Sequence, residues 1–311
     1  MKTFTLAAMA LLASTSLATA APQVVASTKP IHSLVSAVMA GVAEPALIVK
    51  GAASPHTYSL RPSDAAALES ADIVFWTGHG MELFLADALE TLSTNAETVE
   101  LSEAPGISLL PIREGGAFEA HEHEEHDHEE HDHDDHDHAH EEGDMHFWLD
   151  PQNAELMVTE IARVLSDADP ENAATYRANA ETEIAALGAL EAEIDATLLP
   201  VKDKPFLVFH DAYQYFEARF GLAVAGTVTV SPEAMPGAAR IDALRLKVGE
   251  LGATCVFAEP NFEPAIVTTI VEGTEARAGT LDPEGSALTE GPNLYPELLR
   301  GLAAGLVDCL Q

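Results

Sequence analysis

The chain has 311 residues, of which 47% are hydrophobic and 21% are charged, and its formal net charge at pH 7 is −36. This length is sufficient for two lobes of ordinary size, each with its own buried apolar residues. So strong a negative charge repels nucleic acid and anionic lipid, and it attracts cations. We therefore expect no nucleic-acid partner.

The first 20 residues carry one positive charge, Lys2, followed by an apolar stretch that ends in the small residues Ala18, Thr19 and Ala20. This pattern is typical of a cleaved secretory signal peptide, and it is too short and too weakly apolar for a spanning helix. The alternative is an N-terminal membrane anchor. We expect a soluble, exported mature protein that begins near Ala21.

The only cysteines are Cys255 and Cys309. In an oxidising compartment they favour one disulfide bond with each other. The alternative is that both thiolates bind metal, but they lack the close paired spacing of zinc knuckles.

The first half of the chain alternates short β-rich runs with helical stretches, and this alternation predicts βα units around a parallel sheet. Ser63 is the expected cap of the second helix. The expected strands are 24–27, 46–51, 72–78 and 98–103, and the expected helices are 30–39, 63–72 and 81–92.

Residues 119–142 contain 13 acidic side chains, nine histidines and almost no apolar residue. Such a segment cannot bury a core and is predicted to be a disordered loop. Its imidazoles and carboxylates predict weak, exchangeable metal binding, whereas a specific site needs fixed geometry. The histidines of this accessory metal surface are His121, His123, His126, His128, His131, His133, His136, His138 and His140.

A long helix is predicted between Asp169, its expected cap, and Pro200. Apolar residues recur there at steps of three and four, which gives a helix of about 30 residues and about 45 Å. We expect this helix to be a rigid connector between two halves. The apolar positions are Tyr176, Ala180, Ile184, Leu187, Ile194 and Leu198.

The second half repeats the alternation, so the predicted fold class is α/β, with a parallel sheet in each half. The expected strands are 205–210, 222–230, 253–260 and 276–283, and the expected helices are 240–252, 263–274 and 294–310. The expected domains are a signal peptide, 1–20; an N-terminal lobe, 21–152, containing the loop 119–142; a helical segment with the connecting helix, 153–199; and a C-terminal lobe, 200–311.

Three histidines outside the acidic loop, His56, His146 and His210, lie where a βα element ends and a polar turn begins. Ligands of open α/β sheets bind outside the carboxyl ends of the strands, so the three imidazoles could converge between the lobes. Imidazole suits zinc, copper, nickel and iron, and three of them leave one tetrahedral position for a carboxylate or water. Asp282, at the end of a predicted strand, is the best carboxylate candidate. On spacing alone, three unrelated polar residues remain an equal alternative.

Two further histidines have weaker patterns. His32 lies inside a helical segment and is expected to be packed or at the surface, whereas His79 lies in a turn that could approach the pocket. Arg61 and Asp64 could brace the turn that carries His56; an ordinary helix-capping turn is the alternative.

Five motifs in order, HTYSLRPSD, HFWLDP, VFHDAYQYF, CVFAEPNF and GTLDP, resemble those of a known family. It is the ZnuA group, the periplasmic zinc-binding proteins of bacterial ABC-type zinc importers. The resemblance covers essentially all of the mature chain. A His/acid loop between the first two metal histidines is also a feature of the zinc-importing members.

This resemblance implies two (β/α)4-like lobes joined by a long rigid helix, with metal held in the cleft between them. It implies that His56, His146 and His210 are zinc ligands, with Asp282 as a fourth ligand or a neighbour that alternates with water. Related manganese and iron binders tend to have a carboxylate in place of His210. Some zinc members have an acid immediately before the first histidine, where this chain has Pro55.

We therefore expect a binding protein, not an enzyme, that captures Zn²⁺ in the periplasm and delivers it to a membrane permease with its cytoplasmic ATPase. We expect a monomer, and the resemblance also matches the Cys255–Cys309 disulfide of some members. One alternative is a periplasmic zinc buffer or chaperone without a transporter. Another is a secreted zinc hydrolase with Glu259 or Asp282 as general base, although no HExxH motif is present.

Overall fold

The structure is a computed structural model that describes residues 20–113, 143–229, 237–262 and 264–311. The predicted signal peptide, except Ala20, and the His/acid loop with its nine histidines lie outside the described residues. Over the described ranges, every helix is too short or too polar to span a lipid bilayer.

The first half forms a parallel sheet of four strands in the order β2-β1-β3-β4. The strands are β1 (Val24–Ala26), β2 (Ala46–Leu47), β3 (Ile73–Trp76) and β4 (Glu97–Glu100). Each falls within or beside a predicted strand, and β2 is the shortest.

Helices cover both faces of this sheet because its apolar strand residues alternate between the two faces. Val24 and Ala26 of β1 pack on one side, and Val25 packs on the other. The helices of this half are α1 (Lys29–Val38), α2 (Pro62–Glu69) and α3 (Leu83–Leu92), and a 3₁₀ turn, η1 (Leu101–Glu103), follows β4. The expectation that Ser63 caps α2 is wrong, because the helix already begins at Pro62, with Arg61 as its N-cap.

Two long helices follow the 3₁₀ turn η2 (Phe147–Leu149): α4 (Pro151–Ala168) and α5 (Ala173–Leu198). The predicted long helix is therefore α5, but its N-cap is Asn172 and not Asp169. Asp169 instead ends α4 and accepts hydrogen bonds from the Asn172 amide at 2.8 Å and the Tyr176 hydroxyl at 2.9 Å. Asp169 thus fixes the corner between the two helices. The predicted apolar positions of α5 are buried, with Ile184 partly so.

The second half forms another parallel sheet of four strands, in the corresponding order β6-β5-β7-β8. The predicted α/β class with two parallel sheets is confirmed. The strands are β5 (Phe206–Val208), β6 (Val224–Thr227), β7 (Cys255–Ala258) and β8 (Arg277–Thr280), and the helices are α6 (Gln214–Phe220), α7 (Ala238–Leu251), α8 (Pro264–Val271) and α9 (Leu294–Leu310).

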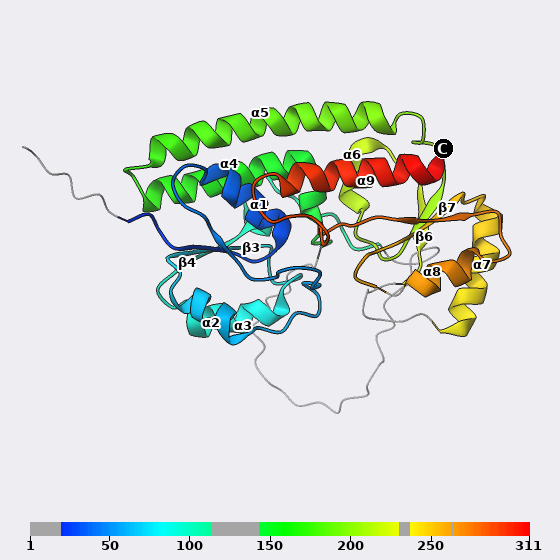
Figure 1. The fold of residues 1–311 in the computed structure, drawn as a ribbon, viewed down its shortest axis with the longest axis horizontal. Coiled ribbons are helices and arrows are strands. Elements are labelled where there is room, and N and C mark those ends of the chain that lie inside the picture. The colour runs from blue at the N-terminus through cyan, green and yellow to red at the C-terminus, as the bar shows by residue number, and fades with distance from the viewer. Residues whose placement is uncertain (1–19, 114–142, 230–236, 263) are drawn as a thin grey trace, which may run out of the picture.

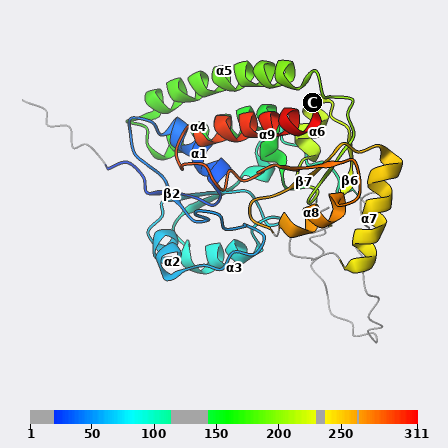
Figure 2. The same cartoon turned by 45° about the vertical axis from the view of Figure 1, so that its right-hand side comes forward.

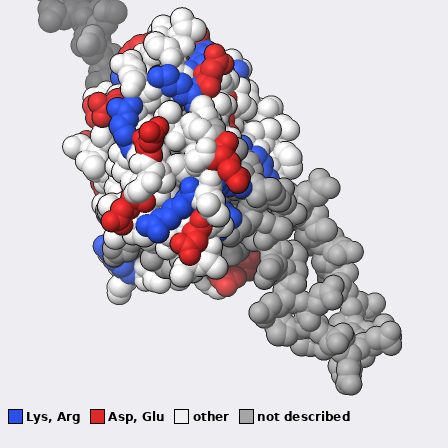
Figure 3. Space-filling model, turned by 90° about the vertical axis from the view of Figure 1, so that its right-hand side faces the viewer, with Lys and Arg blue, Asp and Glu red and all other residues white. Residues whose placement is uncertain are grey.

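Figure 1 shows α5 running along the top of the molecule from above the first sheet towards the second, with α9 below it and roughly parallel to it. The helices α2 and α3 lie under the first sheet, and α7 and α8 lie at the far side of the second (Figures 1 and 2). At the end of the molecule where the second half lies, basic and acidic side chains are interspersed over the visible described surface (Figure 3). That face therefore shows no extended patch of one sign.

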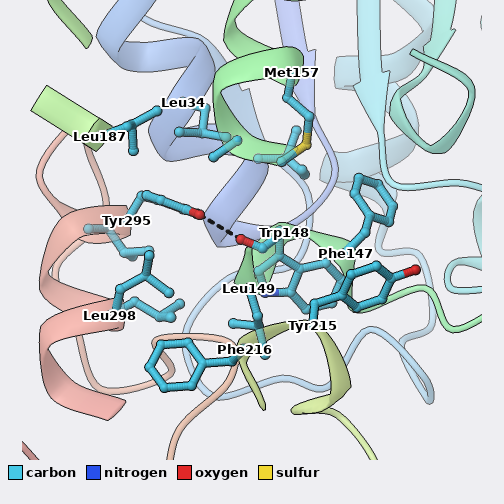
Figure 4. Packing of buried hydrophobic residues seen from close by; sticks show 14 of the residues in the cluster. Leu34, Phe147, Trp148, Leu149, Met157, Leu187, Tyr215, Phe216, Tyr295 and Leu298 are labelled. Carbon is cyan, nitrogen blue, oxygen red and sulfur yellow. Dashed lines mark hydrogen bonds between the residues drawn. The ribbon is translucent and has the colours of Figure 1, made fainter. Parts of the chain in front are cut away.

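The inner faces of the two sheets share one hydrophobic core. Strand residues of both sheets, such as Phe75 and Phe257, belong to the same buried cluster as residues of α1, α4, α5, α6 and α9. At its centre the Tyr295 hydroxyl donates a hydrogen bond of 2.6 Å to the carbonyl of Trp148 (Figure 4). The outer faces have separate clusters under α2 and α3 and under α7 and α8. A large apolar contact of this kind opposes rigid-body motion between lobes.

One disulfide bond joins Cys255 of β7 to Cys309 of α9, as predicted. It pins the last helix to the second sheet, and both thiols are used in it.

Candidate metal centre

His56, His146 and His210 meet at one place, although they come from three separate parts of the chain. One ring nitrogen from each lies within 4.8 Å of the others, and among the described residues this is the group of potential metal ligands that stands out. His56 follows β2, His146 precedes η2, and His210 comes two residues after β5. The structure thus brings together the three histidines singled out in the sequence.

The rings of His146 and His210 point their Nε2 atoms at each other, 3.3 Å apart. Two nitrogens bound to one tetrahedral zinc at 2.0–2.1 Å would be about 3.3–3.4 Å apart. The observed separation therefore fits a pair of ligands to one ion.

A buried carboxylate holds the opposite nitrogen of each of these two rings. The Nδ1 atom of His146 lies 2.8 Å from Asp144, and the Nδ1 atom of His210 lies 2.7 Å from Glu259. A metal-binding imidazole is commonly oriented by such a carboxylate, which fixes the tautomer and leaves Nε2 free to bind. Both rings therefore present a lone pair to the same point.

Burial and the neighbouring rings set the protonation of the group. Burial, reinforced by His146 and His210, lowers the pKa of His56 to about 2, so this imidazole is neutral. For His210, burial favours the neutral form, but the Glu259 carboxylate outweighs it and raises the pKa. The pKa of Asp144 is held low despite its burial by its hydrogen bonds from His146.

The turn that carries His56 is braced from its own lobe. The Tyr58 hydroxyl lies 2.8 Å from Asp64 and 3.1 Å from the carbonyl of Ile48. Asp64 also accepts the backbone N–H of Arg61 at 2.9 Å, and the Arg61 guanidinium lies over the Tyr58 ring. Asp64 thus acts both as a helix-capping group and, through Tyr58, as a brace for the turn.

Asp282 lines the same pocket as His56, His210 and Glu259, but it is not part of the three-histidine group. Its Oδ1 accepts hydrogen bonds from the Glu284 N–H and the Ser286 hydroxyl, both at 3.2 Å. Asp282 therefore stands beside the centre, held by the turn that it begins.

The segments 107–113 and 143–146, on either side of the undescribed loop, are fastened to each other and to α6. Pro111 pairs with Gly143 in an antiparallel bridge, and the Asp144 N–H donates to Leu110 O at 2.7 Å. Arg113 forms ion pairs with both Asp211 and Glu217. The support of His146 therefore includes the helix that follows His210.

The other two histidines of the described residues lie elsewhere. His32 is buried in α1, with Nε2 3.1 Å from the carbonyl of Pro45, and His79 is exposed and pairs with Glu100 at 2.9 Å. Both have partners outside the three-histidine group, and His79 does not join it.

Asp144 was not predicted as a supporting residue, and Glu259 was predicted only as a possible general base. A signal for Glu259 was present: it directly follows β7, which pairs with β5, so it had to lie beside His210. Asp144 has no comparable signal in the sequence, because it lies in a segment without regular secondary structure.

The two-lobed fold and the converging imidazoles define a solute-binding protein of the metal-binding class. More particularly, the chain belongs to the ZnuA family, described as zinc-uptake complex component A, periplasmic, whose sequence model matches residues 24–309. It is thus the zinc-binding component of an ABC-type zinc uptake system and not an enzyme, as predicted.

Relatives with similar sequences match over most of the chain. A high-affinity zinc uptake system protein ZnuA of Brucella suis is 55% identical, over 93% of this chain and 91% of that protein. Those of Paracoccus denitrificans and Yersinia pestis are each 39% identical, covering 93% and 94% of this chain and 92% of each relative.

Solved structures share the fold. A crystal structure of ZnuA has a TM-score of 0.75 at 23% identity, covering 93% of this chain and 100% of that chain. The solute-binding protein FpvC of Pseudomonas aeruginosa in complex with Mn²⁺ has a TM-score of 0.76 at 22% identity, covering 94% and 99%.

Proposed function

We propose that His56, His146 and His210 hold the zinc ion that this protein captures for import. The observation that carries the proposal is the convergence of three imidazole nitrogens within 4.8 Å. Two of the three rings are oriented by carboxylates. Zinc is d¹⁰ and takes a tetrahedral set of nitrogen ligands, which three imidazoles on separate elements can supply.

The charge of the surroundings also suits a divalent cation. The three imidazoles bind as neutral ligands, and the carboxylates of Asp144 and Glu259 each contribute one negative charge next to the rings. Together they balance a charge of +2 in a buried place, where an uncompensated ion would be costly. The fourth position falls to water or to Asp282, which lines the pocket.

The proposal also includes the transfer of the bound zinc ion to a membrane transporter. The exported chain, freed of residues 1–20, acts as a monomer that passes zinc to a membrane permease powered by a cytoplasmic ATPase. Because both lobes share one core, release of the ion proceeds by local movement around the cleft and not by wide hinge opening. The nine histidines of 119–142 serve as an accessory, low-affinity metal surface.

The proposed division of the chain follows the two sheets. The N-terminal lobe, 21–152, contains the first sheet, and the C-terminal lobe, 200–311, contains the second. The segment 153–199 holds α5 and most of α4, which run between them.

The test is zinc stoichiometry and affinity, measured by competition with a chelator. It compares the mature protein with a variant lacking 119–142, with His210→Ala and with His32→Ala, a buried histidine outside the group. We expect one tight site that survives the deletion and His32→Ala and disappears in His210→Ala. Loss of tight binding with the deletion would place the site in the His/acid loop instead.

A further inference from the structure

Lys29, the first residue of α1, is a lysine with only 5% of its surface exposed. Lysine is seldom buried unless its ammonium group is paired. Burial lowers its pKa, whereas the carboxylates of Glu290, Asp282 and Glu284 act in the opposite direction. Two of these three acidic residues, Asp282 and Glu284, line the pocket that also contains His56 and His210.

The ammonium group of Lys29 has a full set of partners. It donates hydrogen bonds to the carbonyls of Gly285 at 3.2 Å, Ser286 at 2.9 Å and Leu288 at 3.3 Å. A lysine has three donors, and here each finds a backbone acceptor. All three acceptors lie more than 250 residues along the chain, in the segment that follows β8, so the contact joins the first half of the molecule to the second.

The same segment begins with Asp282. Its Oδ1 accepts a bond from the Ser286 hydroxyl, and its Oδ2 accepts one from the Ala287 N–H at 3.4 Å. Ser286 therefore links the two residues: its carbonyl accepts a hydrogen bond from Lys29, and its hydroxyl donates one to Asp282. The neighbouring carbonyl of Pro283 accepts the indole N–H of Trp148 at 3.0 Å.

We infer that Lys29 is a positioning residue of the zinc site. From the opposite lobe it holds the segment 282–288 in place, keeps the Asp282 carboxylate in the pocket lined by His56 and His210, and thereby slows zinc release. This inference rests on the proposed binding of zinc by the three histidines.

Lys29→Met removes the three donors while keeping most of the side-chain volume. We expect zinc to dissociate about tenfold faster, in line with the loss caused by removing groups that support metal ligands. Dissociation is measured by transfer to an excess of chelator, with affinity and thermal unfolding measured in parallel. Lys202→Met, which removes a lysine paired with Asp195 near the surface, is the matched control and should leave the rate unchanged.

A double-mutant cycle separates positioning from a merely structural role. If Lys29 acts by placing Asp282, then Lys29→Met should add little to the rate in the Asp282→Asn background, because the effects of coupled residues are not additive. Full additivity, or a rate in Lys29→Met within about twofold of the wild type, would overturn the inference.

Ser286→Ala provides a second variant should Lys29→Met fail to fold. It removes the hydroxyl bond to Asp282 and leaves the Lys29 contacts to backbone carbonyls intact, and we expect faster zinc release here too. An unchanged release rate in Ser286→Ala would contradict the inference. Failure of the three-histidine site would look different, because His210→Ala would then retain tight zinc.

Discussion

Asp144 accepts two hydrogen bonds from His146, one from its ring Nδ1 at 2.8 Å and one from its backbone N–H at 3.0 Å. A single carboxylate thus fixes both the ring and the main chain of this histidine. The Gln214 side-chain amide donates to the other oxygen of Asp144 at 3.1 Å, so the brace is itself held by α6.

Removing the charge of this brace should weaken zinc binding. We expect Asp144→Asn to raise the zinc dissociation constant about tenfold or more, because the imidazole loses the carboxylate that raises its basicity. The measurement is chelator competition, with Asp167→Asn, a surface residue paired with Arg163, as control. Equal affinities for the two variants would show that Asp144 does not support a ligand.

Zinc affinity should fall as the pH is lowered. The pKa of His210 is raised above its usual value of 6.5, so in the free protein a proton competes with zinc for this ring more strongly than it would for an ordinary histidine. Each unit of pH below that pKa should weaken binding by about tenfold for the one proton released. His56, with its pKa near 2, adds no dependence in this range.

The check is a series of competition titrations from about pH 7.5 to about pH 5.5, corrected for protonation of the chelator. Calorimetry in buffers of different ionisation enthalpy counts the protons released. A constant affinity across the series would argue against ligation by His210.

Loss of the disulfide should lower stability without removing the metal site. Cys255 and Cys309 are separated by 54 positions, and closing a loop of that length stabilises by about 4 kcal/mol on the chain-entropy model. We expect Cys255→Ser/Cys309→Ser to unfold at lower denaturant concentration, as should the wild type under reducing conditions. Both should still bind one tight zinc, and loss of that site would point to a role of the cysteines in metal binding.

Tyr295→Phe tests the shared core. It deletes the hydroxyl that binds the carbonyl of Trp148 and leaves a buried acceptor without its partner. We expect a loss of about 1–3 kcal/mol in the free energy of unfolding, measured by denaturant titration. A single cooperative transition should remain, since the two sheets share this core. Two separated transitions would show that the lobes unfold independently.

Much of the fold could be predicted from local pattern. The alternation of strands and helices predicted every strand that the described residues form. The carboxyl-end rule for parallel sheets singled out His56, His146 and His210, with Asp282 as the carboxylate candidate. Helix boundaries were less secure: Asp169 looks like an N-cap before Pro170, yet the helix starts at Ala173. The side chain of Asp169 is equally able to end one helix and fix the corner to the next.

The rest could not be predicted because it depends on distant contacts. Lys29 resembles any residue at the start of a helix, and its carbonyl partners lie more than 250 residues away. Asp144 lies next to the His/acid loop 119–142, whose composition predicts a solvated, charged segment and no ordered hydrogen bond. The apolar face of α5 is evident in the sequence, but the sequence does not reveal that both sheets pack against one core.

The two sheets have the same strand order, and their central strand pairs correspond, with Val24 opposite Ile73 in the first sheet and Phe206 opposite Cys255 in the second. In this correspondence His210 takes the place of Thr28, and Glu259 takes the place of Thr77. The strand arrangement is thus repeated, but at these corresponding positions only the second half has an imidazole–carboxylate pair. The first half provides its histidines from a long turn and from the chain beyond its sheet. A near-symmetric pair of sheets therefore carries an asymmetric set of candidate ligands, one placed directly by a strand end and two by irregular segments outside the sheet.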